Sequence, residues 1–150
     1  MNASSQPEFI LAGVVMKRLL SGAETDGGFC LFDNKSEGLS RTPVHVHARE
    51  DETIFVIEGE MQAIVDAETR TLRAGEAIFL PRGIPHQLMN PSGRPTRYIV
   101  LCVPSGFEGF VAEGGHARAP GEQAAPPGDA DIARMREAAP RFGITLLPGW

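Results

Sequence analysis

Short hydrophobic runs recur along most of the chain, and clusters rich in Gly, Pro, Asn, Asp and Ser separate them. Several runs alternate between apolar and polar positions, as expected of strands with one buried face. The extended segments expected from this pattern are Ile10–Leu20, Phe29–Phe32, Pro43–His47, Thr53–Ile57, Met61–Asp66, Arg70–Arg73, Ala77–Leu80, Gln87–Met89 and Arg97–Val103. A loop is expected over Asp33–Thr42. Short strands at a spacing of roughly ten residues, with turn signals between them, predict an all-β sandwich or barrel.

The pattern changes beyond the last of these segments. Phe107–Val111 is expected to form a short helical turn, and Gly114–Gly128, rich in Gly, Ala and Pro, is expected to be a linker. Asp129 or Asp131 can cap a helix that runs to about Ala139, with apolar residues at helical spacing on one face. We expect that face to pack against the barrel.

Composition narrows the functional classes. The chain has 150 residues, of which 42% are hydrophobic and 22% charged, which suits one globular domain, and no apolar run is long enough for a membrane span. The net charge of -5 and the absence of a basic cluster argue against a nucleic-acid partner. Cys30 and Cys102 lack a metal or redox spacing and are expected to be buried thiols. No signal peptide is expected, so the predicted location is cytoplasmic.

Two histidines with one residue between them lie on the extended segment Pro43–His47. Side chains in a strand alternate between faces, so His45 and His47 point the same way. Glu52 stands at the entrance of the next strand, where its carboxylate can join the two imidazoles. Neutral imidazole is available at pH 7, because its unperturbed pKa is about 6.5. The spacing offers three potential metal ligands, although histidines also occur in strands without a metal.

A second stretch of the sequence favours metal ligands over strand histidines that bind no metal. An apolar run after Gly75 leads into a Pro-x-Gly turn, and the chain then extends again with His86 at its start. Together the two stretches resemble the cupin family. The first motif of the family is His-x-His, three or four residues, Glu, six residues and Gly, and it matches His45, His47, Glu52 and Gly59. The second motif is Gly, five residues, Pro-x-Gly, two residues, His, three residues and Asn. It matches Gly75, Pro81, Gly83, His86 and Asn90.

Two positions need comment. Asp51 competes with Glu52 because the family also allows a three-residue spacing, but only Glu52 leaves six residues before Gly59. The glycine that usually opens the first motif is Leu39 here, with Gly38 one residue earlier, which predicts a slightly longer turn before the strand of the two histidines.

The resemblance implies a double-stranded β-helix, the jelly-roll cupin barrel, with a short C-terminal helix packed outside. We predict a disordered N-terminus over residues 1–8, the barrel over residues 9–104 and a C-terminal extension over residues 105–150. Cupin barrels commonly pair as homodimers, often by adding N-terminal strands to the neighbour's sheet, and Ile10–Leu20 is long enough for this.

The resemblance also implies a metal centre. His45, His47 and His86 would supply nitrogen, and Glu52 oxygen, to one divalent transition metal with about two coordination positions left open. Iron or nickel is favoured, and manganese, copper or zinc suit the same ligands. The activity most similar to this pattern is that of quercetin-dioxygenase-like cupins, acting on a hydrophobic or aromatic hydroxylated small molecule, with Glu52 as both ligand and catalytic base.

Other functions fit the same ligands. A metal-dependent isomerase or lyase without redox chemistry is one alternative, and a non-enzymatic ligand-binding cupin is another. The pocket is expected to be apolar, because Ile54 and Val56 share a face with Glu52, and Leu88 shares one with His86. His116 lies in the expected linker and is predicted to be exposed to solvent.

Overall fold

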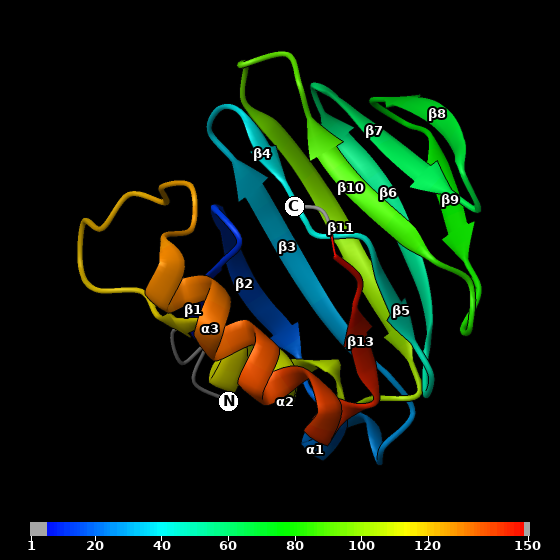
Figure 1. The fold of residues 1–150 in the computed structure, drawn as a ribbon, viewed down its shortest axis with the longest axis vertical. Helices are drawn as coiled ribbons and strands as arrows, with labels where there is room; N and C mark the ends of the chain where they lie inside the picture. The colour runs from blue at the N-terminus through cyan, green and yellow to red at the C-terminus, as the bar shows by residue number, and fades with distance from the viewer. Residues whose placement is uncertain (1–5, 149–150) are drawn as a thin grey trace.

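The structure, a computed structural model, describes residues 6–148, and two antiparallel sheets curl around a common core (Figure 1). Within this range the first sheet has seven strands in the order β12-β1-β2-β3-β11-β6-β9. Their bounds are His116–Ala117 (β12), Glu8–Leu11 (β1), Val14–Leu20 (β2), Cys30–Ser36 (β3), Thr96–Val103 (β11), Asp51–Glu58 (β6) and Ala77–Leu80 (β9).

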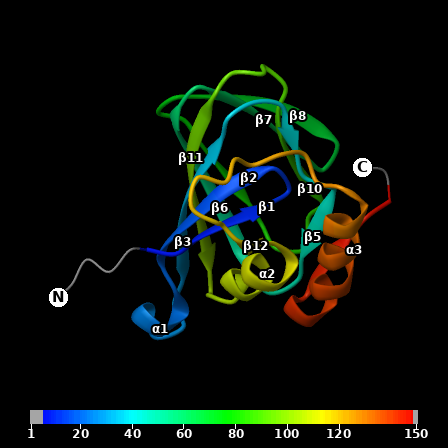
Figure 2. The same ribbon diagram turned by 90° about the vertical axis from the view of Figure 1, so that its left-hand side faces the viewer.

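The second sheet follows the order β13-β5-β10-β7-β8, with β4 also paired to β10. Its strands are Ile144–Leu146 (β13), His45–His47 (β5), His86–Asn90 (β10), Glu60–Val65 (β7), Glu68–Arg73 (β8) and Ser40–Arg41 (β4). Figure 2 shows the two sheets enclosing the interior of a barrel. The predicted all-β jelly-roll fold is confirmed.

The core forms because the strands alternate buried and exposed positions. In β11, Tyr98, Val100 and Cys102 point inward and are at most 5% exposed, whereas the residues between them are partly exposed. Cys102 lies directly opposite Cys30 of β3. Both cysteines are buried free thiols, as predicted.

The N-terminal segment differs from its prediction. Ile10–Leu20 is not one extended segment but the larger part of a hairpin, in which β1 pairs with β2 across a turn at Ala12 and Gly13. The turn uses positive φ angles of 51° at Ala12 and 79° at Gly13. Residues 1–5, most of the predicted disordered N-terminus, lie outside the described residues, and Glu8 already belongs to β1.

The expected loop Asp33–Thr42 is also corrected. β3 continues to Ser36, and Ser40–Arg41 forms β4. Phe32, Asn34 and Ser36 are all buried on the inner face of β3. The sequence pattern hid the end of this strand because two of its four inward positions, Asn34 and Ser36, are polar.

The C-terminal part is built into the barrel. Helices α2 (Phe107–Gly114) and α3 (Asp129–Ala138) pack against each other, and α2 also contacts β1 and β12 (Figures 1 and 2). The remaining helical segments are α1 (Gly22–Thr25) and the 3-10 turn η1 (Ala139–Phe142). Asp131 caps α3 by accepting a hydrogen bond from the backbone N–H of Gly128 at 2.9 Å. The predicted linker is not free of structure, since it contains β12, which pairs with β1.

Candidate metal centre

Three histidines and one glutamate converge between the sheets. His45 and His47 lie on β5, and His86 begins the neighbouring strand β10, directly opposite His45. Glu52 comes from β6 of the other sheet. One nitrogen or oxygen from each of these four side chains lies within 4.8 Å of the others. The structure therefore brings together all four residues predicted from the sequence, in a group able to bind a metal ion.

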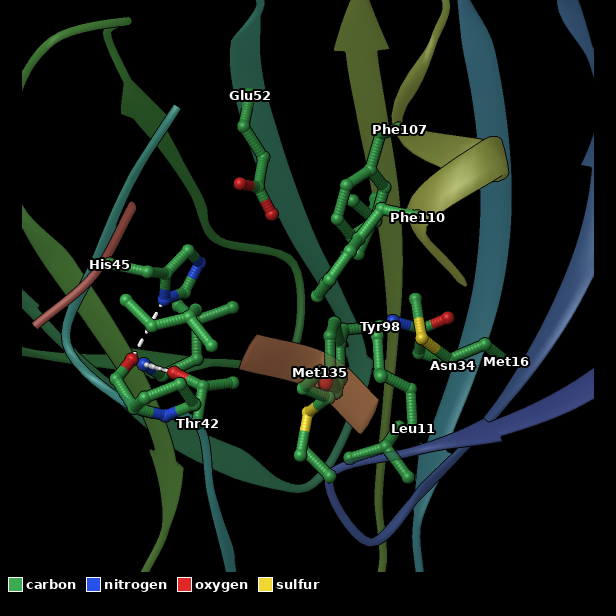
Figure 3. Close-up of a pocket in the computed structure, with 16 residues that line it drawn as sticks. Leu11, Met16, Asn34, Thr42, His45, Glu52, Tyr98, Phe107, Phe110 and Met135 are labelled. Carbon is green, nitrogen blue, oxygen red and sulfur yellow. Dashed lines mark hydrogen bonds between the residues drawn. The ribbon is translucent and has the colours of Figure 1, made fainter. Parts of the chain in front are cut away.

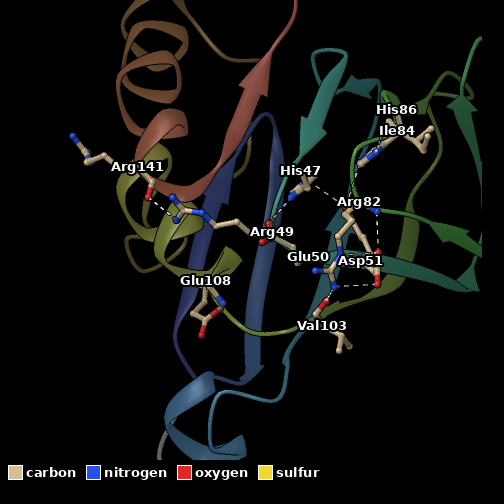
Figure 4. Close-up of polar contacts among 12 residues, drawn as sticks. His47, Arg49, Glu50, Asp51, Arg82, Ile84, His86, Val103, Glu108 and Arg141 are labelled. Atoms are coloured by element: carbon tan, nitrogen blue, oxygen red, sulfur yellow. Dashed lines mark hydrogen bonds and ion pairs between the residues drawn. The ribbon is translucent and has the colours of Figure 1, made fainter.

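The competing carboxylate lies elsewhere. Asp51 is bound to Arg82 on the outer side, with the Arg82 Nη2 to Asp51 Oδ2 distance at 3.2 Å (Figure 4). The backbone N–H of Arg82 also donates to Asp51 Oδ1 at 2.9 Å. The alternation of β6 turns Glu52 inward, where it is 4% exposed. The choice of Glu52 by its spacing to Gly59 agrees with this geometry.

The turns of both motifs fix these strands. Gly83 has a φ of 80°, and its N–H donates to the carbonyl of His47 at 2.8 Å, which ties the Pro-x-Gly turn to β5. Gly59 has a φ of 79°, and a Cβ there would lie 2.5 Å from the carbonyl oxygen of Pro95. A side chain at Gly59 would therefore clash with the backbone beside β11.

Each histidine turns Nε2 toward the centre because its Nδ1 faces an acceptor. His45 Nδ1 donates to the carbonyl of Pro43 at 2.7 Å, and His47 Nδ1 donates to Glu50 Oε1 at 2.6 Å. His86 Nδ1 faces the carbonyl of Ile84 at a longer distance of 3.4 Å. A hydrogen bond at Nδ1 selects the tautomer whose Nε2 carries a free lone pair, which is the form that binds metals.

The atoms at the centre lack partners. Among the described residues, Nε2 of His47, Nε2 of His86 and Oε2 of Glu52 are buried side-chain atoms without a hydrogen bond. Glu52 Oε2 lies 3.5 Å from Nε2 of His47 and 3.2 Å from Nε2 of His86. Leaving such atoms unpaired in the interior costs free energy, and a cation placed among them removes that cost. Three imidazole nitrogens and one carboxylate oxygen fit a divalent transition metal.

The protonation states of His45 and Glu52 favour ligation. Burial, together with the nearby His86 and His47, lowers the pKa of His45 to about 3, so the ring is neutral at pH 7. Burial raises the pKa of Glu52, but the neighbouring histidines outweigh burial and bring the value to about 2. Burial lowers the pKa of His47, and the hydrogen bond to Glu50 with the charge of Glu52 reverses this, so the net shift is upward. Glu52 is thus ionised and attracts a cation.

A mostly apolar pocket opens beside this group, as predicted. Its cavity volume is about 60 Å³, and His45 and Glu52 form part of its wall. Figure 3 shows the Glu52 carboxylate and the His45 ring pointing into this space. Most other lining residues are apolar: Leu11, Ala12, Val14, Met16, Pro43, Leu88, Val100, Phe107, Phe110, Met135 and Leu146. Ile54 and Val56 face inward as predicted and are fully buried, but they do not line this pocket.

Comparison with known proteins identifies the family. Residues 36–103 match the Cupin_2 family, described as a cupin domain. The chain carries a cupin domain. This match contains both motifs and all four side chains of the metal centre.

The relatives of this cupin differ in activity. The chain is 26% identical to quercetin 2,3-dioxygenase from Bacillus subtilis (strain 168) over 108 residues, which cover 71% of the chain and only 32% of the dioxygenase. The structure of the polyketide cyclase RemF from Streptomyces resistomycificus matches with a TM-score of 0.56 and 26% identity, covering 67% of this chain and 70% of RemF. An RmlC-like cupin from Shewanella frigidimarina NCIMB 400 matches with a TM-score of 0.58 and 22% identity, covering 70% of this chain and 88% of that one. The last likeness supports the jelly-roll fold.

Two residues of this cupin were not anticipated. Glu50 is 2% exposed and binds His47, whereas the sequence showed it only as one of three adjacent acids (Figure 4). Its position three residues after His47 is the signal that could have revealed it. His116 was expected to be exposed, but it belongs to β12, is partly buried, and its Nε2 lies 2.8 Å from Glu122 Oε2.

Along residues 6–148, no helix combines the length and the apolar character needed to cross a bilayer. His116 is not part of the group of four potential ligands.

Proposed function

We propose that this cupin holds one divalent transition metal through His45, His47, Glu52 and His86 and acts as a small-molecule dioxygenase. The observation that carries the proposal is the convergence of unpaired, buried ligand atoms beside an apolar pocket. Iron or nickel is the favoured metal, and manganese, copper or zinc suit the same donors. A bound metal of this kind supplies Lewis acidity toward a substrate oxygen and, when redox-active, a partner for dioxygen.

The protein's own residues then bind and orient the substrate. The apolar wall formed by side chains such as Phe107, Phe110 and Met135 favours a hydrophobic or aromatic molecule over a sugar phosphate. Glu52 is ionised and faces the pocket, so one of its oxygens is placed to accept the proton of a substrate hydroxyl. The likeness to quercetin 2,3-dioxygenase supports an aromatic hydroxylated substrate.

A second candidate is a metal-dependent reaction without redox chemistry, such as that of an isomerase or lyase. The likeness to RemF, a polyketide cyclase, favours it. The same ligands and the same pocket serve both reactions, because a Lewis acid polarises a carbonyl as readily as it binds an enolate. A binding module without turnover is the third outcome that the experiment must separate.

Oxygen uptake by protein loaded separately with iron, nickel or zinc distinguishes the three. Quercetin and a set of catechols serve as substrates, with Glu52→Gln as the test variant and Asp51→Asn as its matched neighbour outside the centre. We expect oxygen uptake, coupled to substrate loss, with iron or nickel, lost in Glu52→Gln and kept in Asp51→Asn. Equal turnover with zinc in the absence of oxygen would contradict the dioxygenase and favour the second candidate. Tight binding without turnover for every metal would indicate a binding protein.

A further inference from the structure

One buried polar atom outside the metal centre also lacks a partner. Along residues 6–148, four buried side-chain atoms have no hydrogen bond, and three of them belong to the centre. The fourth is Oδ1 of Asn34, a residue that is 2% exposed. Burying an amide oxygen without a partner costs free energy, so such an atom calls for a ligand or a functional reason.

Asn34 faces the same pocket as the metal centre. It lies on the inner face of β3, directly opposite Tyr98 of β11. Both residues line the pocket together with His45 and Glu52. Figure 3 shows Asn34 and Tyr98 on one side of this space and His45 on the other. The pocket therefore has a polar pair on the wall away from His45.

The neighbouring polar residue on β3 behaves differently. Ser36, two residues further on the same face, donates its hydroxyl to the carbonyl of Gly38 at 2.9 Å and lies 2.9 Å from the hydroxyl of Ser40. Its polar group is satisfied within the fold, as is usual for buried polar groups. The unpaired oxygen of Asn34 is thus not a general property of this strand, since it occurs at the residue that lines the pocket.

The Tyr98 hydroxyl completes the pair. Burial raises the pKa of Tyr98 to about 12, while a hydrogen bond with the Asn34 side chain acts in the opposite direction. The phenol is therefore protonated at neutral pH and has a hydrogen to donate. An amide and a phenol side by side can together both accept from and donate to one hydroxyl group.

We propose that Asn34 and Tyr98 form a second recognition site that binds a hydroxyl group on the substrate's aromatic ring, remote from the oxygens held at the metal centre. This inference rests on the proposed function, because it takes the metal centre as the site that holds the other end of the substrate. The substrate class is accordingly an aromatic compound with a metal-binding oxygen pair and one further hydroxyl remote from that pair.

Binding to the zinc-loaded protein without oxygen tests this directly, since zinc does not oxidise the ligands. The probes are catechols that carry a hydroxyl or hydroxymethyl group at ring position 3 or 4, each compared with its methyl or ethyl analogue. We expect at least one hydroxylated catechol to bind about tenfold more tightly than its alkyl analogue, the effect of about one hydrogen bond to a buried group. In Asn34→Leu this preference is lost, while affinity for the alkyl analogue changes by less than about twofold.

Met16→Leu is the matched control, because Met16 lies beside Asn34 on β2 and lines the same pocket without a hydrogen-bonding role. It should keep the preference. Asn34→Leu removes an unpaired buried oxygen, which favours folding, and also the hydrogen bond to Tyr98, which opposes it. If that variant does not fold, Tyr98→Phe carries the same test and should reduce the preference.

The outcomes separate this inference from the proposed function. Equal affinity for every hydroxylated and alkyl pair, or a preference that survives in Asn34→Leu, would overturn the recognition site and leave the metal centre intact. A preference of the zinc protein for hydroxylated catechols, with no oxygen uptake by the iron or nickel protein, would support the recognition site and contradict the dioxygenase. Failure of all catechols to bind the zinc protein would overturn the recognition site, and the dioxygenase would then be tested by oxygen uptake with quercetin.

Discussion

Glu50 determines which nitrogen His47 presents, although it is not itself one of the four converging side chains. The carboxylate accepts the Nδ1 proton at 2.6 Å, and both side chains are 2% exposed. A carboxylate behind a ligand histidine fixes the ring and raises its basicity. We therefore expect Glu50 to position His47 in the candidate metal centre.

The variant Glu50→Ala should weaken metal affinity by about 10- to 100-fold, because it leaves His47 without its acceptor. Glu50→Gln should restore part of that affinity, since the amide oxygen still accepts the Nδ1 proton. Competition with a coloured chelator measures the affinity, and Asp51→Asn, next to Glu50 but directed outward, is the control. An unchanged affinity in folded Glu50→Ala would remove Glu50 from this role.

Tyr98 provides a pH prediction, because it is the only tyrosine of the chain. Burial, with a contribution from the charge of Glu52, raises its pKa to about 12, above the value of about 10 for an unfolded chain. The folded protein holds this proton more tightly, so the contribution to stability is present below pH 10. It is lost as the pH rises toward 12, by up to about 3 kcal/mol.

The absorption of tyrosinate, followed during an alkaline titration of the folded protein, measures the ionisation of Tyr98 alone. The midpoint should lie near pH 12, and the same titration in denaturant should return to about pH 10. A midpoint near 10 in the folded protein would show that the hydroxyl is not buried.

The strand of the two histidines depends on an element far along the chain. β13 pairs with β5, with Ile144 opposite His47 and Leu146 opposite His45. Ile144 is 3% exposed and belongs to the core, whereas Thr145 is exposed. The C-terminal extension thus covers the edge of β5 that would otherwise be open.

Ile144→Ala should lower the free energy of unfolding by about 2–5 kcal/mol, because it leaves a cavity beside β5. Thr145→Ala, the adjacent exposed position, should change it by less than about 0.5 kcal/mol. Urea denaturation of the two variants compares them. Similar effects in both would mean that the strand pairing, rather than the packing of Ile144, holds the extension in place.

The parts of the fold that depend on local spacing could be predicted from the sequence. Alternation placed His45 and His47 on one face, and the six residues before Gly59 selected Glu52 over Asp51. The first follows from strand period, which acts over a few residues, and the second follows from the resemblance to the spacing of the cupin motif.

The parts that depend on distant pairing could not be predicted. β12 and β13 are short and form strands only by pairing with distant ones. β12 pairs with β1, more than a hundred residues away in the sequence, and β13 pairs with β5, almost a hundred residues away. β3 was cut short because Asn34 and Ser36 are polar at inward positions. Polar residues that line a binding site on the inner face of a strand interrupt the alternation of apolar and polar positions, and Asn34 is such a residue.

For the whole molecule, the homodimer stays a prediction. The structure does not favour a dimer in which the N-terminal strand is added to the neighbour's sheet. The N-terminal strand β1 is paired on both sides, with β2 and with β12 of the same chain. It has no free edge to add to a neighbour's sheet. A dimer would therefore have to use another surface.

Light scattering in solution tests the assembly. We expect a mass of about 32 kDa, twice the chain mass of 16.1 kDa. A mass of 16.1 kDa across the accessible protein concentrations would contradict the homodimer.

The central claim is that four side chains from both sheets form one metal centre. The most direct measurement is elemental analysis of protein purified without chelators, beside the variants His86→Ala and His116→Ala. His116 is the control, because it lies outside the group of four. We predict about one equivalent of a single transition metal in the unmodified protein and in His116→Ala, and its loss in His86→Ala. No metal in the unmodified protein, with none taken up on addition, would contradict the account.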